Sequence, residues 1–273
     1  MRLRKRALVA KFFADRGTHL AAMIAYFALL SFVPLTFLAL SLLGLTGRAD
    51  ESSFLVREIT RSLPGVPIGR IVTLVNDVRE NAATIGVIGG AVLLWTALSF
   101  FSVLESAFNI VYDRPNRSFL HGKALALMLM VGSLVTLFVA LLAGSVGVSV
   151  LSEYVPGFGN NIVAYSLSVA VSTIGVFAFL VSAYWVLTNA DLNLRAVLPG
   201  AILATVALEG SFQILPLYVR YTKVNAALHV FGGTAILLVW LYVMANVIVF
   251  GAELNWWLAR RRDVRLEEGV GLA

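Results

Sequence analysis

Six long apolar runs divide the chain, and short polar connections separate most of them. The runs cover residues 19–46, 84–112, 122–152, 162–188, 196–219 and 231–258. Each is long enough to cross a hydrocarbon core about 30 Å thick as a helix. None alternates apolar and polar residues as the strands of a membrane barrel do. The pattern therefore predicts an all-α integral membrane protein with six transmembrane helices, because helices satisfy their own backbone hydrogen bonds in lipid.

The longest connection, residues 47–83, has a pattern of its own. Apolar residues recur at helical spacing in 54–63 and again in 68–78, and Pro64 and Pro67 interrupt the two series. We expect an amphipathic loop of two short helices on the outer face of the membrane. These helices would either cap the bundle or form a lid over a cavity.

Composition supports the membrane assignment. Hydrophobic residues make up 59% of the chain and charged residues 13%, with a mean hydropathy of +0.88. Ordinary globular domains are about 45–50% apolar and about 25% charged, so a soluble fold could not bury this surface. The chain has no Cys and only three scattered His residues. We therefore expect no disulfide, no metal site and no cofactor.

The distribution of basic residues predicts the orientation. Of the 21 Lys and Arg residues, 14 fall in the two terminal tails and the second and fourth connections, and 7 fall in the first and fifth connections. Basic residues concentrate on the cytoplasmic side of membrane proteins. We expect cytoplasmic basic tails at 1–18 and 259–273 around a transmembrane domain at 19–258. The basic start leads into an apolar run longer than that of a signal peptide, so the first span should remain as an anchor.

Three carboxylates fall inside the predicted spans: Glu105, Glu209 and Glu253. A charged side chain in the middle of a membrane helix costs about 2.5–3.5 kcal/mol on insertion scales, so each is a candidate functional residue. Each has an amide side chain at or near helical spacing. The predicted intramembrane polar path consists of Glu105, Asn109, Glu209, Gln213, Asn246, Glu253 and Asn255.

Two interpretations of these carboxylates remain open. They could line one cavity, or they could hold helices together through interhelical hydrogen bonds of about 0.6 kcal/mol each. The predicted orientation puts Glu105 and Glu253 about 10 Å from the cytoplasmic ends of their spans, at 1.5 Å per residue. There we favour a structural role. Glu209 falls near the midplane, where an ionised group is most costly, and there we favour a functional one.

The end of the sixth span has the composition of a membrane interface. Aromatic and basic side chains follow one another there, which is typical of an interfacial lipid anchor that attracts anionic lipid. The predicted anchor consists of Trp256, Trp257, Arg260, Arg261 and Arg262.

Three stretches carry a family resemblance. Residues 21–35 have an Ala-rich opening followed by Tyr, Leu-Ser and Pro, and residues 106–112 read Ser-Ala-Phe-Asn-Ile-Val-Tyr. Near the end, Trp240-Leu241-Tyr242 precedes Gly-Ala-Glu-Leu-Asn at 251–255. The chain resembles the YihY/virulence-factor BrkB family of bacterial inner-membrane proteins, formerly labelled ribonuclease BN. The resemblance implies six spans and an inner-membrane location, and it implies no settled activity.

Two functions remain open. The chain could transport or handle a lipid or another small amphiphile through an interior polar path, or it could be a non-catalytic scaffold that maintains the envelope. We do not expect an enzyme or a nucleic-acid partner, since nuclease chemistry needs clustered metal-binding residues or an extended basic groove, and the sequence has neither pattern. The sequence leaves the oligomeric state open.

Overall fold

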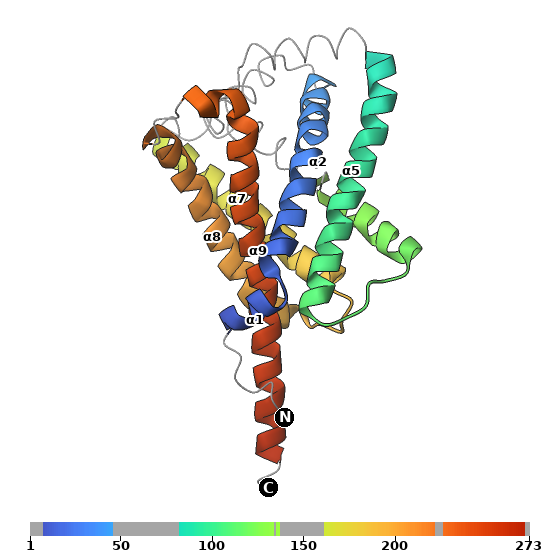
Figure 1. The fold of residues 1–273 in the computed structure, drawn as a ribbon, viewed down its shortest axis with the longest axis vertical. Coiled ribbons are helices and arrows are strands. Elements are labelled where there is room, and N and C mark those ends of the chain that lie inside the picture. Colours follow the sequence, from blue (N-terminus) through green and yellow to red (C-terminus); the bar gives the residue numbers. More distant parts are fainter. Residues whose placement is uncertain (1–7, 46–81, 134, 137–160, 222–225, 271–273) are drawn as a thin grey trace.

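The computed structural model describes residues 8–45, 82–133, 135–136, 161–221 and 226–270, and within these ranges it contains helices and no strand. The labelled helices (Figure 1) are α1 (Leu8–Ala14), α2 (Gly17–Leu45), α5 (Ala82–Val111), α7 (Asn161–Leu187), α8 (Leu194–Tyr221) and α9 (Ala226–Val270). A further apolar helix covers Phe119–Ser133. The predicted all-α fold is confirmed for these residues.

Four helices are apolar over a length that crosses a membrane. The qualifying stretches are Leu94–Val111, Val169–Leu187, Leu194–Ser211 and Leu237–Arg261. Two shorter apolar helices, Gly17–Ser31 and Phe119–Ser133, overlap the first and third predicted spans. The count of six spans stays a prediction, because both of these spans extend beyond the residues whose side chains are described. The two amphipathic helices predicted at 54–63 and 68–78 also lie outside the described residues.

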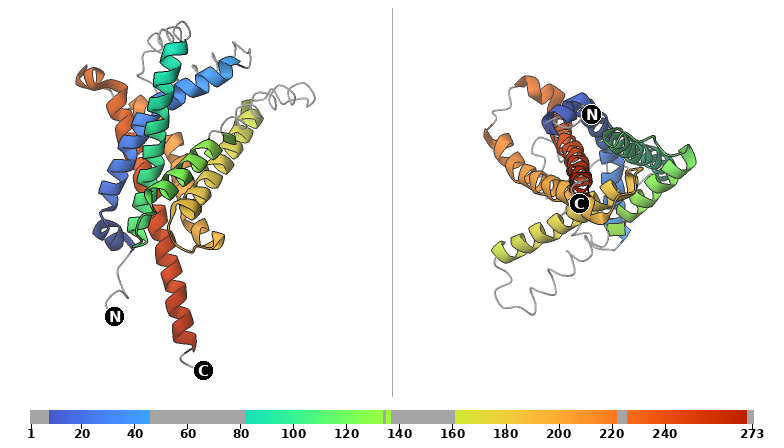
Figure 2. Two further views of the ribbon diagram at one scale, coloured as in Figure 1. Left: turned by 90° about the vertical axis from the view of Figure 1, so that its right-hand side faces the viewer. Right: turned by 90° about the horizontal axis from the view of Figure 1, so that it is seen from below.

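The long α9 helix lies in the middle of the bundle. It packs against α1, α2, α5 and α8, while α2 also packs on α5 and α7 on α8. The helices come together at one end and fan out toward the other (Figures 1 and 2). We call the converging end the terminal end, because α1 lies there and the C-terminal part of α9 projects from it.

Most of the buried side chains that the structure describes lie in the half of the bundle nearest the terminal end. Phe108 of α5 and Tyr184 of α7 are at most 1% exposed, and their ring centroids are 5.1 Å apart. Farther along α7 the packing thins, since Leu180 is 1% exposed and Ile174 is 67% exposed. Exposed apolar side chains away from the terminal end, such as Ile174, are available to lipid or to another apolar molecule.

Two glycines allow α8 and α9 to approach closely. A Cβ atom added at Gly200 would overlap the carbonyl oxygen of Gly251, and one added at Gly251 would lie 2.9 Å from the carbonyl oxygen of Gly200. The Gly200 N–H donates to Oδ1 of Asn255 at 2.6 Å. Small residues at such a crossing bring helix backbones into contact, which strengthens packing where no hydrophobic effect operates.

The predicted N-terminal tail contains a helix that the sequence analysis did not identify. Phe12 of α1 is buried, and its ring centroid lies 5.8 Å from that of Phe250 on α9. Arg16 has a φ of 57°, which turns the chain sharply from α1 into α2. At the other end of the chain, α9 continues as a helix to Val270, so much of the predicted C-terminal tail is helical.

Candidate functional site

Glu253 of α9 forms an ion pair with a lysine from α1. Its side chain is completely buried, and its Oε2 accepts a hydrogen bond from Nζ of Lys11 at 2.8 Å. The same ammonium donates to the carbonyl oxygen of Val111 at 2.9 Å and to Asp15, and it lies 4.2 Å from the ring centroid of Trp256. All three N–H donors of Lys11 therefore have acceptors. The second oxygen of Glu253, Oε1, is buried without a partner among the described residues.

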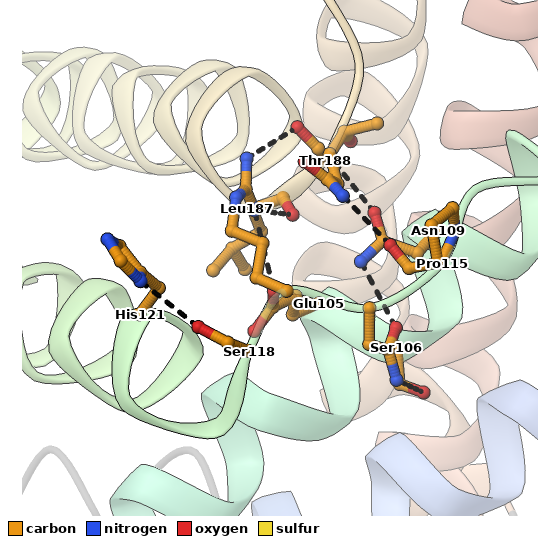
Figure 3. Close-up of polar contacts among 11 residues, drawn as sticks. Glu105, Ser106, Asn109, Pro115, Ser118, His121, Leu187 and Thr188 are labelled. Atoms are coloured by element: carbon orange, nitrogen blue, oxygen red, sulfur yellow. Dashed lines mark hydrogen bonds and ion pairs between the residues drawn. The ribbon is translucent and has the colours of Figure 1, made fainter.

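Glu105 of α5 lies beside an arginine that follows the same helix. Nη1 of Arg117 is 3.4 Å from Oε1 of Glu105 and donates to the carbonyl oxygen of Leu187 at 2.7 Å. Nη2 donates to the carbonyl oxygen of Thr188 at 3.0 Å. Figure 3 shows Glu105 near Leu187 and Thr188 at the end of α7. The guanidinium thus caps the last carbonyl groups of α7, where a helix carries partial negative charge, and it binds them more closely than it binds the carboxylate.

The turn after α5 places Arg117 at that position. Asp113 has a φ of 54°, in the left-handed region that commonly ends helices. The N–H of Arg114 then bonds back to the carbonyl oxygen of Asn109 at 2.8 Å. The chain turns there and passes the C-terminal end of α7 before the helix at 119–133 begins. A helix-ending motif close to α5 therefore brings Arg117 back to Glu105.

Asn109 bonds to this turn and to the chain after α7. Its Oδ1 accepts from the backbone N–H of Asn189 at 2.7 Å, and its Nδ2 donates to Oδ1 of Asn116 at 3.1 Å. Asn116 in turn donates to Oγ of Ser106 at 3.0 Å (Figure 3). Asn109 is completely buried, so these bonds satisfy an amide that would otherwise be costly in the core.

The two asparagines of α9 have separate roles. Asn255 is buried and holds the close contact of α8 with α9 through Gly200, as described above. Asn246 donates to the carbonyl oxygen of Tyr242, one turn earlier on its own helix, at 2.7 Å. These bonds join backbone to side chain, and neither involves Glu253.

Glu209 lies in a different environment from the other two carboxylates. It is half-buried on α8, and its Oε1 accepts a hydrogen bond from Oγ of Ser172 on α7 at 3.0 Å. No ion pair to Glu209 occurs among the residues that the structure describes. The side chain of its predicted companion, Gln213, lies outside the described residues.

The three carboxylates thus have partners on three different elements. The recorded bonds go to Lys11, Arg117 and Ser172, none of which the sequence analysis placed in the site. Lys11 and Glu253 are 242 residues apart, so no local spacing could reveal the pair. The only nearby signal is Asp15, four residues after Lys11, because such a pair supports a short helix. A single cavity shared by the three carboxylates stays a prediction.

The predicted lipid anchor forms cation–π pairs at the terminal end. Arg261 lies 3.6 Å from the ring centroid of Trp257, and Arg260 lies 5.7 Å from that of Trp256. Both arginines are exposed and both tryptophans are half-buried. The side chain of Arg262 lies outside the described residues. Elsewhere in the described ranges, no three His, Asp or Glu side chains gather as a metal site requires.

Together, the long apolar helices and their buried polar contacts define a class of protein, the helical integral membrane proteins. Within that class, the chain belongs to the BrkB virulence factor family, whose model matches residues 8–270. The family assignment made from the sequence is confirmed.

Curated relatives share about a quarter of their residues with this chain. A putative ribonuclease-like protein, YfkH, of Bacillus subtilis is 24% identical over 266 residues, which cover 94% of this chain and 95% of that protein. A UPF0761 membrane protein of Psychrobacter is 26% identical over 93% of this chain, and one of Nitrosospira multiformis is 25% identical over 94%. The matches cover 48% and 62% of these two longer proteins. No solved structure matches the chain.

Proposed function

We propose that the protein transports or otherwise handles a lipid or a small amphiphile, and that Glu209 binds the polar part of this cargo. The observation that carries the proposal is the contrast among the three intramembrane carboxylates. Glu105 and Glu253 have cationic partners at the terminal end, whereas the recorded partner of Glu209 is a neutral hydroxyl. A carboxylate in apolar surroundings is costly unless it acquires a cation or a proton. Glu209 can therefore bind the cationic part of a cargo.

The position of Glu209 supports this role. It lies 15 residues after Leu194, the first residue of α8, which corresponds to about 22 Å at 1.5 Å per residue. That depth is near the middle of a bilayer about 40–45 Å thick including its interfaces. A polar group at this level has little access to water from either surface, and it can therefore serve a cargo that crosses the membrane.

The surroundings favour an amphiphile over a hydrophilic solute. Val206, almost one turn before Glu209 on α8, is 68% exposed, and Val171, next to Ser172 on α7, is 45% exposed. A cargo bound at Glu209 would contact apolar side chains as well as one carboxylate and one hydroxyl. Such a combination suits a molecule with a small polar or cationic head and an apolar tail.

A scaffold is the alternative, and the ion pairs at the terminal end favour it. Lys11 and Arg117 each join elements from distant parts of the chain, as a purely structural network would. In that case the Ser172–Glu209 hydrogen bond would also only hold α7 to α8. The two functions differ in what they require of Glu209, because a hydrogen bond needs no charge and a cationic cargo does.

We place this activity in a bacterial cytoplasmic membrane, with six spans and both termini cytoplasmic. The excess of basic residues in the tails and in the second and fourth connections supports this orientation. The location of α1 and the C-terminal part of α9 at one end of the bundle is consistent with it. Arg260 and Arg261 would then lie where anionic lipid is most abundant.

The decisive experiment compares variants of the Glu209–Ser172 pair in proteoliposomes. Gln at position 209 keeps the size of the side chain and an acceptor for Ser172 but removes the charge. We expect Glu209→Gln to abolish movement of a fluorescent phosphatidylethanolamine between leaflets while leaving thermal stability unchanged. Ser172→Ala, which keeps the carboxylate, should retain measurable movement. Ser211→Ala is the matched control, since the bond recorded for Ser211 among the described residues goes to its own helix backbone, at Ala207.

The scaffold function makes the opposite prediction. It expects no lipid movement above that of protein-free vesicles, and a loss of thermal stability in Ser172→Ala. Wild-type movement that persists in Glu209→Gln would contradict the charge-based role of Glu209.

A further inference from the structure

Two short segments outside the long helices supply the cations that neutralise the carboxylates of the terminal end. Lys11 comes from α1, a helix of seven residues, and Arg117 comes from the turn between α5 and the helix at 119–133. The two cations are held in different ways. This difference indicates which segment can move.

Arg117 is fixed by the backbone. Its two recorded bonds to the carbonyl groups of Leu187 and Thr188 are 2.7 and 3.0 Å long, shorter than its 3.4 Å contact with Glu105. These carbonyl groups end α7 and need a donor whatever the state of Glu105. Loss of the carboxylate would therefore leave Arg117 in place.

Lys11 has only one carboxylate partner outside its own segment, Glu253, among the described residues. Besides Asp15 of its own segment, its ammonium contacts Glu253, one carbonyl oxygen of α5 and the face of Trp256. This contact set bridges α1, α5 and α9 across the terminal end. Among the described residues, α1 is therefore docked by the packing of Phe12 on Phe250 and by these contacts of Lys11, and only the Lys11–Glu253 pair joins two charges between α1 and α9.

Lys11 and Glu253 can also be stable apart, with α1 moved away from the bundle. A buried ion pair gains little net free energy, because burial removes both charges from water. Among the described residues, Oε1 of Glu253 has no hydrogen-bond partner in the docked state. If α1 moved away, water could reach both groups and solvate them fully. Such near balance is what a two-state element requires.

The connection from α1 to α2 is a short corner at which the helix can turn. It consists of Asp15 and Arg16, and Arg16 has the left-handed φ of 57°. Gly17 follows directly, with the ring of Phe12 packed against it. A few backbone dihedral angles at such a corner can absorb the motion of a whole short helix.

We propose that α1 is a gate helix that closes the terminal end of the bundle, with the Lys11–Glu253 ion pair as its latch. The Arg117–Glu105 pair is a fixed structural contact and takes no part in opening. The proposal rests on the proposed transport function, because a scaffold needs no gate. Opening moves α1 about the corner at Asp15 and Arg16 and exposes Glu253 to water from the terminal side.

Distance measurements by pulsed electron spin resonance test the motion without any cargo. The chain has no Cys, so nitroxide labels can be placed at Val9→Cys on α1 and Leu194→Cys on α8, both of which are exposed. In nanodiscs of phosphatidylethanolamine and phosphatidylglycerol, we expect two distance populations. Lys11→Gln should raise the ratio of the longer to the shorter population at least about tenfold, since it leaves Glu253 without a cation.

Matched variants separate the gate from general loosening. Glu105→Gln removes the other buried carboxylate and should leave the two populations unchanged. The exchanged pair Lys11→Glu with Glu253→Lys should return the ratio toward that of the wild type. A single narrow distance in every variant would overturn the proposal, as would an equal shift in Glu105→Gln.

A reversible lock tests whether the motion is needed for activity. Cys residues at Phe12 and Phe250, whose ring centroids are 5.8 Å apart, can be joined by a short cleavable thiol crosslinker. The control pair is Phe101 and Phe179, with centroids 6.4 Å apart and the same interplanar angle of 64°. Crosslinking α1 should stop movement of the fluorescent lipid until the linker is cleaved, and crosslinking the control pair should not.

The outcomes distinguish this proposal from the proposed function. Two populations of α1 together with full activity of Glu209→Gln would contradict the role of Glu209 and leave the gate standing. Loss of activity in Glu209→Gln with undiminished movement in the α1-crosslinked protein would contradict the gate alone.

Discussion

Gly200 and Gly251 illustrate how two residues without side chains position two helices. Their backbones meet where α8 crosses α9, and Asn255 bonds to the N–H of Gly200 at the same point. The hydroxyl of Tyr184 bonds to the carbonyl oxygen of Ile248, just before Gly251, at 2.7 Å. Close contact and polar bonds therefore coincide at one crossing, and a side chain on either glycine would force the neighbouring atoms to shift.

Gly200→Ala should lower the stability of the protein by about 1–3 kcal/mol, the usual cost of an overpacked contact, since the new Cβ would meet backbone and cannot be relieved by a rotamer change. Thermal or denaturant unfolding in detergent micelles measures the difference. Gly210→Ala is the matched control on the same helix, where a Cβ would meet nothing within 4 Å. It should be neutral or stabilising by up to about 1 kcal/mol, because Ala favours helix over Gly.

At the same scale, the polar residues show why residue type alone did not assign a role. In the sequence, Glu105, Glu209 and Glu253 each had an amide at or near helical spacing and differed only in their predicted depth. In the structure, the amides bond elsewhere or lie outside the described residues, and the carboxylates differ in their partners. The distinction depends on neighbours that are distant in sequence.

Among the elements, α1 most changes the interpretation of the sequence. Lys11 and Arg16 were counted only as basic residues that set the orientation of the chain. The structure makes Lys11 a buried partner of α9, with Phe12 beside it. A segment too short to be recognised as a helix by its pattern is therefore held in place by tertiary contacts.

Gly17→Ala should loosen α1 without disturbing the rest of the bundle. The added Cβ would overlap the ring of Phe12, which is buried and packed against Phe250, so α1 would have to shift. We expect amide hydrogen exchange in residues 8–14 to become at least about fivefold faster, corresponding to about 1 kcal/mol. Exchange in α8 should stay unchanged. Gly175→Ala, where a Cβ would meet nothing within 4 Å, should leave α1 protected as in the wild type.

On the scale of the whole molecule, the contacts recorded between distant segments concentrate at the terminal end of the bundle. Among the described side chains, most of those at most 1% exposed lie in the half nearest this end, and α7 and α8 also carry exposed apolar residues such as Ile174 and Val206. Two ion pairs join several elements there. The terminal end is thus held together by contacts between distant segments, and the orientation in the membrane decides which compartment it faces.

Reporter fusions test this orientation. The excess of basic residues in the tails predicts that the terminal end faces the cytoplasm. An alkaline phosphatase fused after Ala273 should be inactive, and one inserted at Gly65 in the long connection should be active. A green fluorescent protein at the same two positions should give the complementary pattern. Phosphatase activity at Ala273 would invert the orientation and the depth assigned to each carboxylate.

The sequence by itself determined the class of protein and the approximate position of its helices. The runs predicted at 84–112 and 162–188 correspond closely to α5 (Ala82–Val111) and α7 (Asn161–Leu187). Membrane helices can be located in this way because their hydrogen bonds are local and their apolar surface is set by composition alone. The run at 231–258 was shorter than α9, since a helix continues into polar sequence until something ends it.

Only the tertiary structure decided what the polar residues do. It paired Glu253 with a lysine 242 residues away and placed Arg117 at the C-terminal end of α7. The partner that it records for Glu209 is a neutral hydroxyl. The physical reason is that a buried charge is stabilised by whatever donors the fold brings within about 3 Å. Hydrophobic periodicity fixes which residues enter the membrane, but the packing of the helices against one another determines which charges meet there.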